Sequence, residues 1–203
     1  MAIDNRERVG RVALTVAAGI VMLSLGGIRV SAQTGCVPED FSAWAVNRGS
    51  NVIFPMSIVE IHIDRWSTER EKDRFARTLL NRGPATLLQA LRDAAPVGVI
   101  RNPLTVPDDV LFAWQEPVVD GGRRIIVITD RPMLLWKESM QVEGTEDTFT
   151  VIELRLGPNG EGEGKAAIGS NIGVDRSLDL IELTDYASAP LRLVEVRVTR
   201  TTS

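Results

Sequence analysis

The segment "IVEIHIDRWSTEREKDRFARTLLNR", residues 58–82, decides the fold, because the spacing of its apolar residues changes halfway along. In its first half, Val59, Ile61 and Ile63 alternate with polar residues, which is the pattern of a half-buried strand over Ile58–Trp66. In its second half the alternation gives way to the wider spacing of a helix. One chain therefore carries both periods, and the sequence predicts an α+β fold.

Two short helices are predicted after this strand. Thr68 and, three residues later, Glu71 form the pattern of a capping box at the start of a helix over Glu69–Arg82. The Gly83-Pro84 step ends this helix and begins the next one. We therefore expect an αα-hairpin at about residues 68–95.

Strand-like alternation dominates the rest of the chain, and its segments are consecutive and closely spaced. Such spacing favours an antiparallel meander that closes into a barrel or a sandwich. The predicted fold is predominantly antiparallel β, with about nine strands and an inserted αα-hairpin, and the turn Asp185–Pro190 is expected to join its last two strands. The nine predicted strands are Phe41–Asn47, Ile58–Trp66, Val97–Arg101, Val110–Glu116, Arg123–Thr129, Phe149–Leu156, Lys165–Gly173, Leu178–Leu183 and Leu191–Val198.

The glycine-rich stretch Leu154–Ser170 resembles a ligand loop at first sight, but its spacing fits neither a P-loop nor a dinucleotide-binding turn. Glu161 and Glu163 would also repel a phosphate. The tetrad Gly157–Gly160 is typical of a tight turn. The stretch therefore predicts the tip of an acidic, water-facing hairpin, with weak calcium contact as the one functional alternative.

Residues 1–32 have the pattern of a signal peptide: a basic start, an apolar run and small residues before a cleavage point at Gln33. The remaining residues 33–203 then form a single mostly-β domain that is exported, either periplasmic or secreted. Two less favoured alternatives are an uncleaved N-terminal anchor and a lipid anchor at Cys36. After cleavage we expect no membrane association.

Charge argues against a nucleic-acid partner, and cysteine content excludes an internal disulfide bond. The net charge is −4 and no long basic run is present, so the sequence predicts no nucleic-acid partner. The single cysteine cannot form an internal disulfide, so packing must stabilise the exported domain.

The chain has one histidine, so a serine or cysteine hydrolase would have to use His62 as its base. Glu60, His62 and Asp64 alternate along the predicted strand and would share one face. These three residues are candidate ligands for a divalent metal ion. The alternative is that they form the hydrated face of an amphipathic strand.

A mechanism that uses only carboxylates, as in glycoside hydrolysis, also stays open. The chain has 27 acidic residues, so composition points to no particular pair. No cofactor is expected.

Four tryptophans accompany a single tyrosine, and indole rings can serve as flat platforms for sugars or apolar molecules. Trp66 is the most suggestive, because the predicted strand places it on the face of the three candidate metal ligands. The alternative is ordinary core packing. The candidate ligand-binding residues are Trp66, Trp114, Trp44, Trp136 and, at a strand end, Arg131.

Three stretches carry a resemblance to an uncharacterised family of small exported bacterial proteins: Asp64–Thr68, Thr129–Pro132 and Phe149–Lys165. The resemblance spans most of the predicted mature chain. It implies export but no known activity, so it assigns no catalytic residue.

We therefore expect an exported, non-catalytic domain that binds a small apolar or saccharide ligand or a protein partner. The alternatives are a carboxylate-dependent hydrolase, with a metal near His62, and an envelope-assembly or adhesion factor.

Overall fold

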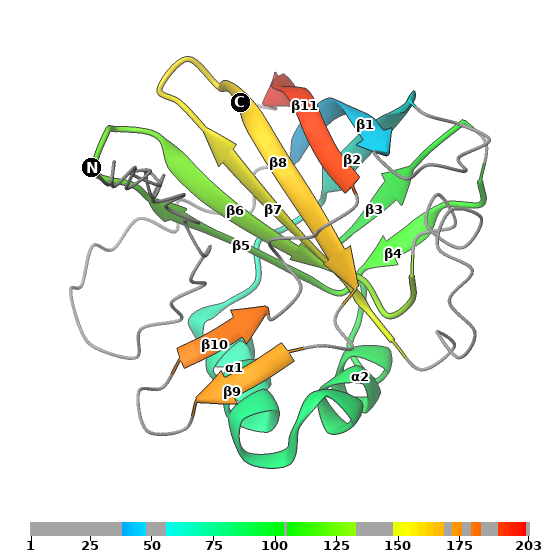
Figure 1. Cartoon of the computed structure of the whole chain (residues 1–203), viewed down its shortest axis with the longest axis vertical. Helices are drawn as coiled ribbons and strands as arrows, with labels where there is room; N and C mark the ends of the chain where they lie inside the picture. Colours follow the sequence, from blue (N-terminus) through cyan, green and yellow to red (C-terminus); the bar gives the residue numbers. More distant parts are fainter. Residues whose placement is uncertain are drawn as a thin grey trace, which may run out of the picture.

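The computed structural model describes residues 38–47, 56–103, 105–132, 148–168, 172–175, 180–183 and 191–201. The predicted signal peptide, Cys36, Trp136 and the predicted turn Asp185–Pro190 lie outside these residues. Within them, one sheet of nine strands and one of two strands accompany a pair of helices (Figure 1). The predicted fold class is confirmed.

The elements follow each other with short connections wherever both ends are described. Their order is β1 (Glu39–Asn47), β2 (Met56–Ile63), α1 (Glu69–Arg82), α2 (Pro84–Arg92), β3 (Gly98–Arg101), β4 (Asp108–Val110), β5 (Phe112–Pro117), β6 (Arg123–Ile128), β7 (Thr150–Leu156), β8 (Glu161–Ile168), β9 (Ile172–Asp175), β10 (Leu180–Leu183) and β11 (Leu191–Thr201).

The large sheet curls into a nearly closed barrel, which settles the choice between barrel and sandwich. Its strand order is β4-β3-β2-β1-β11-β8-β7-β6-β5, and all neighbouring strands are antiparallel. The first and last strands of this order, β4 and β5, are consecutive in the chain and separated only by Leu111. The Leu111 amide donates to the carbonyl of Ile128 at 2.9 Å, so the chain passes from one sheet edge to the other without leaving the hydrogen-bonded wall.

Apolar side chains fill the interior of the barrel. Val59, Ile61 and Ile63 on β2 point inward and are at most 2% exposed, as their alternation predicts. Side chains from β1, β3–β8 and β11 complete the same cluster, and Leu154 at its centre is fully buried. Burial of this cluster is the main source of stability.

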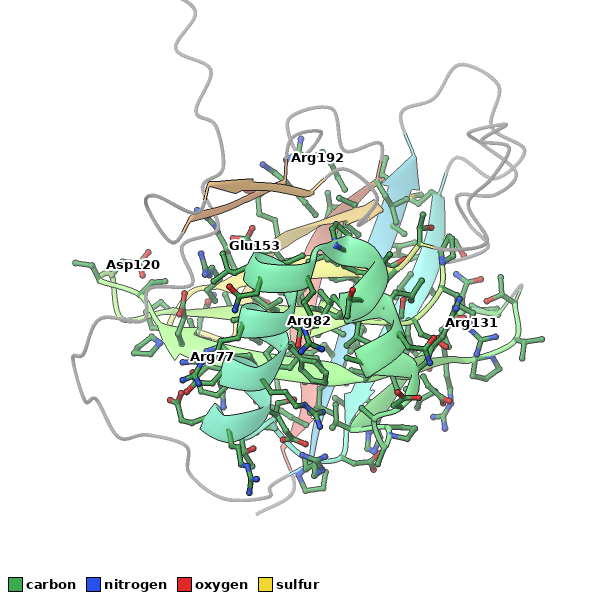
Figure 2. The ribbon with its side chains drawn as sticks, turned by 90° about the horizontal axis from the view of Figure 1, so that it is seen from below. Arg77, Arg82, Asp120, Arg131, Glu153 and Arg192 are labelled. Carbon is green, nitrogen blue, oxygen red and sulfur yellow. The ribbon has the colours of Figure 1, made fainter. Side chains whose placement is uncertain are left out.

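The helix pair covers the outer face of the β5–β8 wall, where it forms a second apolar cluster (Figure 2). Phe75 of α1 meets Phe112 of β5 edge to face, with ring centres 5.8 Å apart. Outward-pointing residues of the sheet, such as Trp114 and Val151, lie under the helices. This side of the barrel is therefore closed to solvent, whereas the β1–β3 wall is not covered by either helix.

The helix boundaries agree with the sequence prediction. The Thr68 hydroxyl accepts from the Glu71 amide at 3.2 Å, and the Glu71 carboxylate accepts from the Thr68 amide at 2.7 Å. A bidentate ion pair with Arg65 is the largest cause that lowers the pKa of Glu71 to about 2. Gly83 has a positive φ of 84° between the two helices.

Three strand predictions needed correction. The segment Val110–Glu116 was expected to be one strand, but it breaks at Leu111, where the wall changes from β4 to β5. The strand predicted over Ile58–Trp66 ends at Ile63, because the chain then turns toward α1. The C-terminal meander is also different, since β10 pairs with β9 in the small sheet while β11 lies between β1 and β8.

None of the helices in the described part of the chain is long and apolar enough to cross a membrane.

Candidate functional site

The candidate site lies on the outer face of the β1–β2–β3 wall. Because β2 alternates, burying Ile61 and Ile63 inside the barrel sends Glu60 and His62 to the outside. Their partners across the ladder are Ser42 and Asp40 on β1. The register of β1 against β2 is regular, so these four side chains share one face of the wall.

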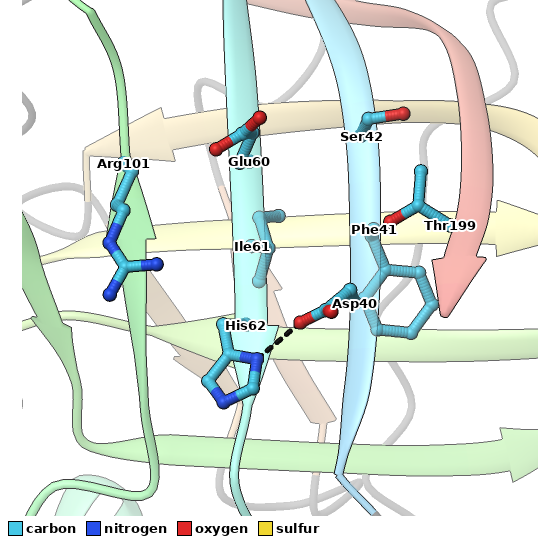
Figure 3. Close-up of a pocket in the computed structure, with 8 residues that line it drawn as sticks. All are labelled: Asp40, Phe41, Ser42, Glu60, Ile61, His62, Arg101 and Thr199. Atoms are coloured by element: carbon cyan, nitrogen blue, oxygen red, sulfur yellow. Dashed lines mark hydrogen bonds and ion pairs between the residues drawn. The ribbon is translucent and has the colours of Figure 1, made fainter. Parts of the chain in front are cut away.

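His62 is held between two carboxylates. Its Nδ1 atom contacts Oδ1 of Asp40 in a short hydrogen bond, and its Nε2 atom lies 3.0 Å from Oδ1 of Asp64 (Figure 3 draws the Asp40 contact). The Asp40 side chain is 20% exposed and that of Asp64 66% exposed. The Asp40 contact is therefore the better shielded of the two.

This arrangement favours the imidazolium form of the ring. An ionised carboxylate only accepts hydrogen bonds, so both ring nitrogens must donate, and only the protonated ring has two N–H groups. The hydrogen bond to Asp40 is the largest cause that raises the pKa of His62; partial burial opposes it, and Asp64 adds to it. The side chain thus links Asp40 on β1 to Asp64 just beyond the end of β2, and its protonated form is favoured.

A hollow of about 420 Å³ lies beside the His62 side chain. Polar side chains from four strands dominate its outward-facing lining, while Phe41 and Ile61 point into the barrel. Its lining residues, all drawn in Figure 3, are Asp40, Phe41, Ser42, Glu60, Ile61, His62, Arg101 and Thr199.

Glu60 and Arg101 are register partners on β2 and β3, and both are exposed. Among the described residues, neither side chain takes part in an ion pair or a hydrogen bond. The hollow therefore presents one carboxylate and one guanidinium whose hydrogen-bonding groups are available to a ligand.

Trp44 lies immediately beside the hollow, although it is not part of its lining. It is two residues beyond Ser42 on β1, opposite Ile58 of β2, and both Trp44 and Ile58 are 37% exposed. Met56, the next outward residue of β2, is also exposed. An apolar strip therefore continues the polar hollow along the same two strands.

The other candidate ligand-binding residues do not gather with Trp44. Trp114 is buried under α1, with the ammonium group of Lys72 4.2 Å from its ring centre. Trp66 packs against the interior cluster of the barrel. Because β2 ends before it, Trp66 does not continue the outward face of Glu60 and His62.

Arg131 lies elsewhere, at the end of β6. Its Nε atom is 3.0 Å from the buried Asp108 and 3.7 Å from Asp130. Burial raises the pKa of Asp108, the Arg131 charge opposes this shift, and the charges of Asp130 and Asp109 add to it. Arg131 is thus engaged in an ion pair that ties the end of β6 to β4.

Of the three candidate metal ligands, His62 and Asp64 are in contact and Glu60 lies further along β2. Both nitrogens of His62 already face different carboxylates. No group of three or more histidine, cysteine or acidic side chains is arranged to hold a metal ion within the described ranges.

Sequence reasoning missed four polar residues of the hollow: Asp40, Ser42, Arg101 and Thr199. A local signal existed for Ser42, because the alternation of the first predicted strand sends it to the same face as Trp44. For Asp40 and Arg101 the necessary information is the pairing of β2 with β1 and β3, which no local pattern contains.

Compared with known protein families, with curated proteins and with solved structures, the chain matches none. The site must therefore be interpreted from its own geometry.

Proposed function

We propose that this chain is an exported, non-catalytic binding domain, periplasmic or secreted, whose small ligand occupies the hollow on the β1–β3 wall. The observation that carries the proposal is the pair Glu60 and Arg101, whose charged groups line the hollow with no partner among the described residues. Hydrogen-bonding groups that converge on a hollow beside apolar side chains are the usual features of a small-molecule site.

The hydrogen bonds of His62 favour a binding function over nucleophilic catalysis. A general base must accept a proton from its nucleophile, here Ser42. His62 instead donates to Asp40 and Asp64 and holds its proton more firmly than a free histidine does. Both ring nitrogens face carboxylates, so neither is directed at the Ser42 hydroxyl as a general base would have to be.

The test is a screen of a small-fragment library by NMR on the mature chain, read on the single histidine side chain and on the amides of β1–β3. We expect fragments that shift these signals to lose affinity in Glu60→Gln and in Arg101→Gln. Glu163→Gln is the matched control, because this exposed residue of β8 lies three strands from β2 in the sheet order. Fragments that bind all variants equally would place the ligand elsewhere.

A second candidate is a carboxylate-dependent hydrolase, favoured by the presence of Asp40 and Glu60 in one hollow. Its test is product formation from aryl glycosides, compared between the wild type and Glu60→Gln. Turnover that Glu60→Gln abolishes would replace the binding proposal by this one.

A further inference from the structure

The outer face of β1 and β2 changes from apolar to polar along the strands. The cross-strand pair Trp44–Ile58 is followed by the pair Ser42–Glu60 and then by Asp40–His62. Consecutive pairs on one face are about 7 Å apart, because each residue advances the strand by about 3.4 Å. A ligand that covers Trp44 and also enters the hollow must therefore extend over at least one such step.

The polar part of this face offers both donors and acceptors. Glu60 only accepts, Arg101 only donates, and the hydroxyl groups of Ser42 and Thr199 do both. A hydroxyl group on the ligand also donates and accepts, so a ligand with several hydroxyl groups can satisfy all of these side chains at once.

The hollow carries charges of both signs. The guanidinium of Arg101 lies across the ladder from Glu60, and the ring of His62, whose protonated form is favoured, contacts Asp40 and Asp64. A strongly anionic ligand would be repelled by these carboxylates, and a strongly cationic one by the Arg101 guanidinium. A wholly apolar ligand would remove Glu60 and Arg101 from water without replacing their hydrogen bonds. The mixture of opposite charges favours a neutral, polyhydroxylated ligand.

The apolar part of this face further restricts the class of ligand. Trp44 is 37% exposed and lies opposite Ile58 in the β1–β2 ladder, and Ile58 and Met56, the next outward residue of β2, are also exposed. The apolar C–H face of a sugar ring stacks on such a surface, while its hydroxyl groups point sideways to polar neighbours. We infer that the ligand is a neutral oligosaccharide of at least two rings, one stacked on Trp44 and the next hydrogen-bonded by Glu60 and Arg101 in the hollow.

This inference rests on the proposed binding function and narrows it to one ligand class. The experiment is a titration of the mature chain with neutral tetrasaccharides, namely those of glucose in α- and β-linkage, of xylose and of N-acetylglucosamine. Calorimetry measures the affinity. We expect at least one of them to bind. Trp44→Ala should lower the affinity for that saccharide about tenfold, which is the upper range for one aromatic contact. Trp44→Phe should keep most of the affinity.

Glu60→Gln should weaken the binding of the same saccharide, because the neutral amide of glutamine cannot form the charge-assisted hydrogen bonds of the carboxylate. The matched controls are Glu163→Gln on β8 and Val119→Ala, which changes an exposed apolar residue between β5 and β6. Trp44, Glu60 and both control residues are exposed, so circular dichroism and the melting temperature should show that all variants fold.

Three other results are informative. If no tetrasaccharide binds while library fragments bind the hollow in the NMR screen, the saccharide inference fails and the binding function stands. If neither binds, both fail. Saccharide binding that Trp44→Ala and Glu60→Gln leave unchanged would place the sugar away from this face and overturn the inference.

Discussion

His62 is the residue whose ionisation the fold controls most directly. Asp40 contacts it from β1, while Glu60 on β2 and Asp64, just beyond the end of β2, flank it along the chain. From β3 and β4, Arg101 and Asp109 are the charged residues of the same wall. The acids outnumber the single guanidinium in this set, which agrees with a raised pKa for the ring.

A raised pKa makes stability depend on pH. The folded chain holds the His62 proton more tightly than the unfolded chain, so the stabilisation is complete below the ordinary value of 6.5 and is lost as pH rises through the folded pKa. We predict that the free energy of unfolding in urea falls as the pH rises above 6.5 in the wild type, and that most of this dependence disappears in His62→Gln.

The two carboxylates should contribute unequally. Asp40→Asn should lower the pKa of His62 more than Asp64→Asn does, because Asp64 is 66% exposed and its charge is screened by solvent. As the only histidine of the chain, His62 gives an unambiguous NMR titration. Equal shifts in the two variants would contradict the unequal roles assigned to the contacts.

At the scale of elements, the β7–β8 hairpin explains the glycine-rich stretch. The turn residue Gly160 has a positive φ of 77°, as the tight-turn prediction requires. Gly162 has a different reason: a Cβ atom there would overlap the carbonyl oxygen of Arg155 on β7. β8 is paired with both β7 and β11, and its glycines, which lack a Cβ atom, allow these neighbouring strands to lie close to it.

We predict that Gly162→Ala destabilises the chain by about 1–3 kcal/mol, the usual cost of adding a methyl group where backbone must move. Gly157→Ala in the same hairpin is the control. Its Cβ would first meet Oδ1 of Asn159, at 3.1 Å. This side chain can shift at the cost of its hydrogen bonds with Glu161, so we expect a smaller loss than for Gly162→Ala. Urea unfolding of both variants measures the difference, and equal losses would show that the overlap with Arg155 is relieved at no cost.

Element types could be predicted from the sequence because their signals are local. The capping box at Thr68 and Glu71 and the alternation of β2 need only a few neighbouring residues, and both were confirmed. The candidate site needed contacts between distant residues, such as Asp40 with His62, 22 positions apart. Trp114 shows the same limit, since its burial depends on the packing of α1 against the sheet.

At the scale of the whole molecule, an ion pair joins two opposite parts of the barrel wall. Arg123 at the start of β6 donates to Glu39 at the start of β1, with nitrogen–oxygen distances of 2.9 and 2.5 Å. β1 and β6 are not neighbours in the sheet, since β11, β8 and β7 separate them. Arg123 also donates to Gln115 at 2.9 Å, and Glu39 is buried. The ion pair therefore connects β1 and β6, two strands that are not neighbours in the sheet, at one end of the barrel.

We predict that Arg123→Met lowers the free energy of unfolding by about 2–3 kcal/mol, because it leaves the Glu39 carboxylate buried and unpaired. Loss of a fully buried pair costs about 3–5 kcal/mol, and the side chain of Arg123 is 27% exposed, which reduces the penalty. The double variant Glu39→Met, Arg123→Met should recover part of this loss, since no unpaired charge is left inside the barrel. Urea unfolding of both single variants and the double variant gives the coupling, and strictly additive losses would mean that the pair does not hold the two parts of the wall together.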